Sequence, residues 1–387
     1  MEKVLEYTLR QEDLESTAEG LVNLILKNCL RVTGHEISRA KYTPDGITVD
    51  GKQTRVSERM LPGQTLRVRL PEDPAKDGKM VPQFGDLPGG GPLEILYEDD
   101  DVLLVNKPAG IVVHPSPGHY RDTMANYIAG YFQEKGEQTA CRIIGRLDKE
   151  TSGVLLYAKN RAAAARLTRG RARQSEETSK DLSGEQKTSN GLSGRQKPSD
   201  GRSGAKPLSA YERTYFALAE GFIPEENGIV ENRMDSIPDV LLKRQITEDG
   251  SGMPARTAYQ VLQRSESATL LKLHIDTGRT HQIRLQMAGI GHPLVGDTIY
   301  GSDAPDIQGE DAERGHYVSM PDRPTPPETA DGIRENAVTA GPRAMLHAGI
   351  LEFDQPFSGE KIRITAGFPE DFLQKCLYYG LSADGIL

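Results

Sequence analysis

The chain has 387 residues, which at roughly 150 residues per domain points to two or three domains. Hydrophobic residues make up 36% and charged residues 27%, and no apolar run approaches the roughly eighteen residues that a membrane span needs. Residues 1–10 lack the apolar middle of a secretory signal, and the three cysteines share no C-x-x-C spacing. We therefore expect a cytoplasmic protein without a membrane segment, a disulfide framework or a zinc cluster.

Opposite charges are separated along the chain, although the net charge is -9. Residues 21–70 hold nine basic and four acidic residues, whereas residues 302–341 hold nine acidic and three basic ones. The acidity belongs mainly to one segment, so the net charge does not exclude a polyanionic partner.

The N-terminal 72 residues form the first predicted module. Apolar spacing predicts a helix at residues 19–30, a short polar helix SRAKY follows at 38–42, and alternation predicts strands at 47–56 and 64–70. The stretch ISRAKYTPDGITVDGKQTRVSERMLPGQTLRV resembles the alpha-L RNA-binding domain, with Ser38 opening the second helix. Any small α+β module with a solvated basic face is the alternative. The candidate RNA-binding residues are Lys27, Arg31, Arg39, Lys41 and Arg55.

Three segments have the composition of linkers or loops. Residues 73–91 read as a linker to the main body, and residues 170–207 and 302–341 read as low-complexity insertions. The first insertion is either a flexible basic loop or an accessory RNA-contacting arm, and the second is assigned no function.

The main body, residues 92–387, begins with a predicted β-hairpin at 93–110. Further strands are predicted at 153–159, 214–221, 257–264 and 269–276, and amphipathic helices at 121–132 and 280–289. Strands and helices do not alternate regularly, and neither G-x-G-x-x-G nor a P-loop is present. We therefore predict an α+β fold with a mixed, mainly antiparallel sheet flanked by helices.

One aspartate stands in a polar loop that precedes a predicted strand. The segment 144–153, IGRLDKETSG, holds Asp148 before a Thr-Ser-Gly turn. An ionised carboxylate there could attack an electrophile or stabilise a cation. From spacing alone, Asp148 could equally be a turn residue or a member of a surface ion pair.

A second polar cluster lies where a strand meets a helix, at residues 276–285, DTGRTHQIRL. Thr280 is the expected helix cap, and Arg284 could bind a carboxylate or phosphate with both guanidinium nitrogens. The alternative is a capped helix with a solvated basic face. His281 has no second ligand at metal spacing, so no metal site is predicted.

Five blocks in order are similar to one enzyme family: NKPAGIVVHP, GRLDKETSGVLLYAKN, ERTYFALAEG, DTGRTHQIRLQMAGIGHPLVGDTIYG and RAMLHAG. They resemble the RluA/RluD-type family of pseudouridine synthases, most closely its large-subunit ribosomal RNA members with an alpha-L domain in front. The resemblance implies a small RNA-binding domain before a mixed, mainly antiparallel catalytic domain. It also implies isomerisation of specific uridines to pseudouridine in ribosomal RNA of the large subunit or its precursor. We expect a monomer that uses no cofactor, since the isomerisation needs no redox step, group donor or metal.

The resemblance carries roles to four residues. Asp148 matches the catalytic aspartate, and Arg146 matches the arginine that fills the gap left by the flipped uridine. Tyr215 matches the tyrosine that stacks on the base and assists proton abstraction, and Arg284 the arginine that pairs with the catalytic carboxylate. Further candidate substrate-binding residues are Asn106, Lys107, Arg279, His281 and Gln282.

Two positions depart from the family pattern. Gly145 stands where histidine usually opens the aspartate block, and Arg213 stands where lysine is common. A glycine opening is typical of a sister family with the same aspartate, so the chemistry is expected to be unchanged while the subgroup is left open.

Several alternatives stay open at the level of the sequence. Asp148 could attack the sugar, deprotonate it or stabilise its developing positive charge. A protein of another class, a non-catalytic RNA-binding or ribosome-assembly factor, would use the same basic module without turnover. Glycoside hydrolysis would require a second carboxylate across the scissile bond, and no candidate for one stands out.

Overall fold

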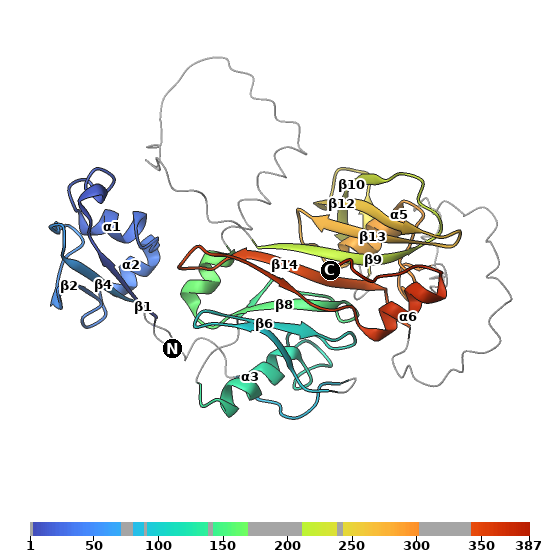
Figure 1. Ribbon diagram of the computed structural model, residues 1–387, viewed down its shortest axis with the longest axis horizontal. Helices are drawn as coiled ribbons and strands as arrows, with labels where there is room; N and C mark the ends of the chain where they lie inside the picture. The colour runs from blue at the N-terminus through green and yellow to red at the C-terminus, as the bar shows by residue number, and fades with distance from the viewer. Residues whose placement is uncertain are drawn as a thin grey trace, which may run out of the picture.

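The computed structural model describes residues 3–70, 80–88, 91–137, 142–168, 211–237, 243–301 and 342–387. Both predicted insertions, 170–207 and 302–341, lie outside the described residues. Figure 1 shows a small N-terminal domain beside a larger body built around one extended sheet.

The N-terminal domain contains a four-stranded antiparallel sheet in the order β1-β4-β2-β3. Its strands are β1 (Lys3–Thr8), β2 (Ile47–Val49), β3 (Lys52–Gln53) and β4 (Thr65–Leu70). Helices α1 (Val22–Asn28) and α2 (Gly34–Ala40) pack on it, after a single 3-10 turn, η1 (Gln11–Asp13). The sequence predicted both helices and the later strands but not β1, which completes the sheet along β4.

Helix α2 begins four residues earlier than predicted. The Thr33 hydroxyl accepts from the backbone N–H of Glu36 at 3.1 Å, and the Glu36 carboxylate accepts from the Thr33 N–H at 2.7 Å. This reciprocal pair satisfies two backbone N–H groups at the helix start. Ser38 therefore lies inside the helix and does not open it.

The main body is organised by an eleven-stranded sheet. The order β11-β10-β12-β13-β9-β14-β8-β6-β5 runs along it, with β7 pairing β8 and β15 pairing β14. The strands are β5 (Glu94–Glu98), β6 (Val102–Lys107), β7 (Arg142–Ile144), β8 (Ser152–Ala158), β9 (Glu212–Glu220), β10 (Asn227–Ser236), β11 (Arg244–Thr247), β12 (Met253–Arg264), β13 (Ala268–Ile275), β14 (Leu346–Asp354) and β15 (Lys361–Thr365). Of the described pairs, β8 with β14 is parallel and the others are antiparallel. The predicted fold class, α+β with a mixed, mainly antiparallel sheet, is confirmed.

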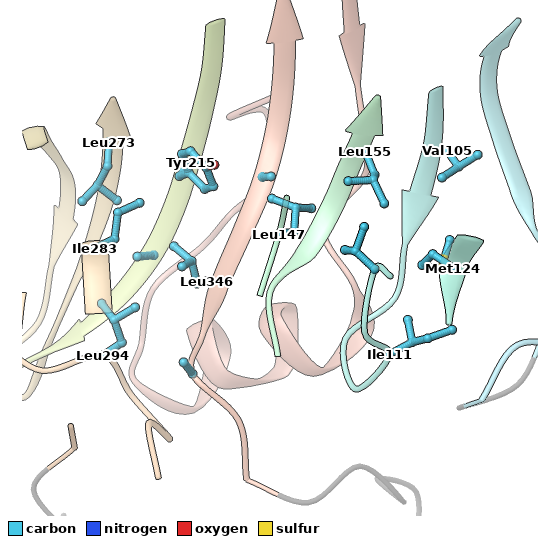
Figure 2. Packing of buried hydrophobic residues seen from close by; sticks show 14 of the residues in the cluster. Val105, Ile111, Met124, Leu147, Leu155, Tyr215, Leu273, Ile283, Leu294 and Leu346 are labelled. Atoms are coloured by element: carbon cyan, nitrogen blue, oxygen red, sulfur yellow. The ribbon is translucent and has the colours of Figure 1, made fainter. Parts of the chain in front are cut away.

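Helices cover both faces of this sheet because side chains alternate along each strand. On one face, Figure 2 shows Val105, Leu155, Tyr215 and Leu273 packed in a continuous layer. Helices α3 (Met124–Glu134) and α5 (Gln282–Gly289) cover this layer, and α6 (Glu370–Tyr378) packs on the opposite face. No helix among the described residues combines the length and the apolar character that crossing a membrane would take.

Part of the predicted linker belongs to the main body. The backbone N–H of Gln83 donates to the carbonyl of Asn126 in α3 at 2.9 Å, and Asn126 Nδ2 donates to the carbonyl of Val81 at 2.7 Å. Leu87 is buried in the same apolar layer as α3. Within the segment 73–91, residues 80–88 are thus fixed on α3.

The two domains meet at a small junction centred on Phe357, in the turn between β14 and β15. Lys3 Nζ lies 4.7 Å from the centre of the Phe357 ring, and the Arg166 guanidinium lies 4.3 Å from it. Each cation also forms an ion pair across the boundary, Lys3 with Asp101 at 2.8 Å and Arg166 with Glu36 at 3.0 Å. Apolar, cation–π and ionic contacts therefore join the domains at one place.

Candidate active site

A cavity of about 310 Å³ opens on the face of the sheet covered by α5. This volume lies at the lower end of the roughly 300–1,000 Å³ typical of small-ligand sites. Its wall is formed by residues from four separate segments of the chain. They are Gly145, Arg146, Leu147, Asp148, Thr151, Tyr211, Arg213, Tyr215, Ile275, Gly278, Arg279, Thr280, Gln282, Ile283, Arg284 and Leu346.

Asp148 lies half-buried in the loop of residues 145–151, which joins β7 to β8 and is called the Asp148 loop below. The loop closes on itself where the backbone N–H of Thr151 donates to the carbonyl of Asp148 at 3.2 Å. Its far end is tied to the turn after β6, because the Gly110 N–H donates to the carbonyl of Lys149 at 2.8 Å. The carboxylate therefore stands in a loop with fixed ends.

Lys107 lies beneath this loop and does not line the cavity. Its fully buried Nζ donates to the carbonyls of Pro108, Ile111 and Lys149 at 2.8 to 3.0 Å. Burial lowers the pKa of Lys107 to about 7, against the opposing effect of the Asp148 charge. Three acceptors match the three N–H donors of an ammonium group, so this geometry favours the charged form.

Neither Lys107 nor Asn106, both expected to bind substrate, lines the cavity. Lys107 supports the Asp148 loop from inside the protein, out of reach of a ligand. Asn106, at the end of β6, is absent from the residues that line the cavity, and its Nδ2 donates to Glu94 at 2.8 Å on the neighbouring strand.

Arg284 is buried in the cavity wall. Its ion-pair partners are carboxylates other than Asp148, the partner that the family pattern implies. Its Nε and Nη2 donate to the two carboxylate oxygens of Asp297 at 2.7 and 2.6 Å, and Nη2 lies 3.2 Å from Glu150. Among the ion pairs of the described residues, none joins Arg284 to Asp148. Asp148 still acts on it through space as a nearby negative charge.

The pair of Arg284 and Asp297 stays charged although it is buried. Burial opposes both charges, but their mutual hydrogen bonds outweigh it, so the pKa of Arg284 is raised and that of Asp297 is lowered. Sequence reasoning missed Asp297, although it stands inside the quoted block at VGDTIYG. No local signal marks it as the partner of a residue thirteen positions earlier.

Tyr215 and Arg146 both line the cavity. Tyr215 projects from β9 into the buried layer near Leu346, as Figure 2 shows, and it lines the cavity. Arg146 is exposed at the cavity edge, and its Nη2 donates to the Thr280 hydroxyl at 3.5 Å. The four residues carried over from the family pattern therefore all line one cavity.

The segment before α5 is built differently from the prediction. The N-cap of α5 is His281, which adopts the left-handed conformation with φ 57°, and Thr280 lies outside the helix. His281 is buried, its Nδ1 lies 3.1 Å from the Tyr300 hydroxyl, and burial lowers its pKa. Gln282 is also buried, and its side chain bonds Thr277 at 2.7 Å.

These contacts separate the three remaining substrate-binding candidates. His281 and Gln282 use polar side-chain atoms to hold the loop before α5. Arg279 and Gln282 both line the cavity, and Arg279, which is partly exposed, is the better placed of the two to contact a ligand.

The basic candidates of the N-terminal domain lie on its surface. Lys27, Arg31, Lys41 and Arg55 are exposed, and Arg39 is partly exposed. The backbone of Arg31 reaches the domain junction, where its carbonyl accepts from Arg166 Nη2 at 3.2 Å. Over the described ranges, no group of three or more His, Cys, Asp or Glu side chains is arranged to hold a metal ion.

Several known proteins are similar in sequence to this chain. A family model described as RNA pseudouridylate synthase matches residues 101–178 and 206–289. The RNA pseudouridine synthase YlyB of Bacillus subtilis is 30% identical over 373 residues, 95% of this chain and 97% of that one. Ribosomal large subunit pseudouridine synthase D of Nitrosomonas europaea is 29% identical over 328 residues, 84% of this chain and 74% of its own. The same-named protein of Neisseria meningitidis serogroup A is 30% identical over 340 residues, 87% of this chain and 73% of its own. The chain therefore belongs to the RNA pseudouridine synthase family.

Proposed function

We propose that this protein isomerises specific uridines of large-subunit ribosomal RNA to pseudouridine in the cavity beside the Asp148 loop. One observation carries the proposal. Asp148, Tyr215 and Arg284 come from three distant segments and line the same cavity in a chain of this family. The large-subunit substrate is inferred from the names of the relatives.

The reaction breaks the bond between the ribose C1′ and N1 of uracil, turns the base and joins C1′ to C5. The proton on C5 is lost and N1 gains one, so no atom enters or leaves overall. Asp148 faces the sugar, as nucleophile, base or counter-charge to a developing cation. Arg284 acts indirectly, because it neutralises the charges of Asp297 and Glu150. Asp148 is then the carboxylate directed at the substrate.

The target nucleotide must leave its stack before it can enter the cavity, at a cost of a few kcal/mol. Stacking of the base on the ring of Tyr215 would offset this cost by about 1–3 kcal/mol. Arg146, exposed at the cavity edge, is suited to fill the gap left in the RNA. Arg279, which lines the cavity, would contact a phosphate beside the target.

The N-terminal domain completes the proposal as an RNA-binding module. Its exposed basic residues would hold phosphates of a structured RNA while the cavity accepts one nucleotide. A monomer suffices for this arrangement, since all the proposed groups lie in one chain. The proposed ribosomal RNA substrate implies a cytoplasmic protein.

The substitution Asp148→Asn tests the central claim. The amide has nearly the shape of the carboxylate but no charge, so we expect no detectable pseudouridine. RNA affinity should stay within about threefold, because phosphate and stacking contacts are unchanged. Primer extension over modified large-subunit RNA, with a filter-binding titration, measures both.

Asp384→Asn, in an exposed C-terminal turn, is the matched control and should leave activity unchanged. Pseudouridine formed by Asp148→Asn would refute the catalytic role. If the unaltered protein bound RNA but formed no pseudouridine in a single-turnover reaction, a non-catalytic assembly role would replace the proposal.

A further inference from the structure

Arg213 of β9 lies buried beside the Asp148 loop, where it also forms part of the cavity wall. Its Nη2 donates to the carbonyls of Ile144 and Gly145 at 3.2 and 3.0 Å, and its Nη1 donates to the carbonyl of Arg146 at 3.5 Å. One guanidinium therefore binds three successive carbonyls of the chain that leads to Asp148.

Three successive carbonyls do not normally converge on one group. In an extended chain they point alternately to opposite sides. Here Gly145 has φ 71°, a left-handed conformation that turns the chain directly after β7. The turn at Gly145 and the position of Arg213 therefore depend on each other.

The same glycine is also required by its neighbours. A Cβ at position 145 would overlap the hydroxyl of Tyr211, and it would lie 2.8 Å from Tyr211 Cζ and 3.0 Å from Arg213 Nη1. The Tyr211 ring in turn lies 5.2 Å from the Arg213 guanidinium. Gly145 and Arg213, the two departures noted in the sequence, are thus in contact and share Tyr211 as a neighbour.

We propose that Arg213, Tyr211 and Gly145 form a loop clamp that fixes where Asp148 and Arg146 stand in the cavity. Arg213 is then a positioning residue for the reaction, and Tyr211 and Gly145 determine where its guanidinium lies. This inference rests on the proposed function. The clamp holds the start of the Asp148 loop, while Lys107 holds its end through the carbonyl of Lys149.

The planar guanidinium suits this task better than an ammonium group would. It carries five N–H donors in a rigid fork and stays charged when buried, whereas lysine presents a single point of charge on a flexible stem. Lysine at position 213 would reach fewer of the three carbonyls, and the loop would gain freedom. A displacement of about 1 Å of a reacting group can cost about 100-fold in rate.

The test is the substitution Arg213→Lys, assayed under single-turnover conditions on an unmodified transcript of large-subunit ribosomal RNA. We expect the rate of pseudouridine formation to fall by about 10- to 100-fold while the RNA dissociation constant stays within about threefold. A merely structural role would lower the melting temperature without this split between rate and binding.

Arg264→Lys is the matched control. Arg264 also forks onto loop carbonyls, those of Ile223 and Pro224, but it is absent from the residues that line the cavity. Its substitution should lower the melting temperature to a similar extent and leave the single-turnover rate unchanged.

A double-mutant cycle keeps the test decisive if Arg213→Lys folds poorly. Gly145→Ala should slow the reaction, and adding Tyr211→Phe should restore part of the rate, because the overlapping hydroxyl is gone. Additive effects of the two substitutions would contradict the clamp.

Other outcomes separate this inference from the proposed function. An Arg213→Lys protein as fast as the unaltered one would overturn the clamp and leave the proposed function standing. Loss of RNA binding instead of rate would make Arg213 a structural or RNA-contacting residue. An unaltered protein that forms no pseudouridine would defeat the proposed function, and the clamp with it.

Discussion

His347 is a buried histidine at the start of β14, between the two halves of the large sheet. Its Nδ1 accepts from the Ser152 hydroxyl at 2.9 Å, and its Nε2–H donates to the carbonyl of Ala366 at 3.0 Å. Both contacts suit a neutral ring, with the donor and acceptor roles assigned from the partners. Burial lowers the pKa of His347 to about 4.

This shift predicts a loss of stability in mild acid. The unfolded chain takes up a proton on this imidazole near its ordinary pKa of 6.5, whereas the folded protein resists protonation down to about 4. The unfolded state therefore binds more protons between these values, and stability falls as the pH falls. From about pH 7.5 to about pH 5, His347 should account for about 2 kcal/mol of the loss.

Urea unfolding followed by circular dichroism at the two pH values measures this contribution. His347→Gln should be less stable at neutral pH but should lose about 2 kcal/mol less on acidification than the unaltered protein. His114→Gln, at an exposed position, should keep the full loss. An equal acid loss in all three proteins would show that His347 is not the titrating group.

At the scale of the elements, the parallel pairing of β8 with β14 depends on Gly153. It has φ 113°, and a Cβ there would overlap the carbonyl oxygen of Ala348 and lie 2.6 Å from its carbonyl carbon and 2.8 Å from its nitrogen. All three contacts are backbone atoms of the facing strand, so no side chain can move aside.

Gly153→Ala should therefore destabilise the protein by at least about 3 kcal/mol, the sum of backbone strain and the separation of two central strands. Gly250→Ala is the control, because Gly250 has φ 81° but open space around it, and should cost only about 1–2 kcal/mol. Thermal unfolding compares the two. Equal losses would mean that the strands separate without penalty.

Elements with a strong local sequence pattern were predicted correctly. Strands whose pairing depends on distant segments of the chain were not. The hairpin at 93–110 and the helices at 121–132 and 280–289 have clear periodicity, and all three are present. β14 escaped prediction because RAMLHAG is short and its partners, β8 and β9, lie far earlier in the chain. The start of α2 is marked in the sequence by Thr33-x-x-Glu36, a capping box that precedes the predicted helix SRAKY.

The candidate site was predictable to a similar degree. Asp148, Tyr215, Arg284 and Arg146 followed from the family pattern, and all line the cavity. The contacts that hold these residues in place could not be predicted from the sequence. Arg284 pairs with Asp297, and Arg213 with backbone carbonyls, only because the fold brings them together.

At the scale of the whole molecule, Phe357 connects the N-terminal domain to the main body. Its ring centre lies 4.7 Å from Lys3 Nζ and 4.3 Å from the Arg166 guanidinium, contacts worth about 0.5–2 kcal/mol each. The ring also packs against apolar residues of both domains. We infer that it fixes the basic surface of the first domain at one distance from the cavity.

Phe357→Ala should loosen this arrangement without unfolding either domain. Small-angle scattering should give a larger maximum dimension, because the domains separate where few other contacts join them. Phe222→Ala is the control, since Phe222 also lies near an arginine, Arg264, but away from the junction. Unchanged dimensions in the Phe357 variant would show that the ion pairs alone hold the domains.

The place of β14 in the sheet has a consequence for shortened forms of the chain. β8 and β9 follow one another among the described strands, but β14 lies between them, and Leu346 of β14 also lines the cavity. A chain that stops before residue 346 lacks the strand that lies between β8 and β9 and one residue of the cavity wall. We therefore expect such a truncated chain to form no pseudouridine.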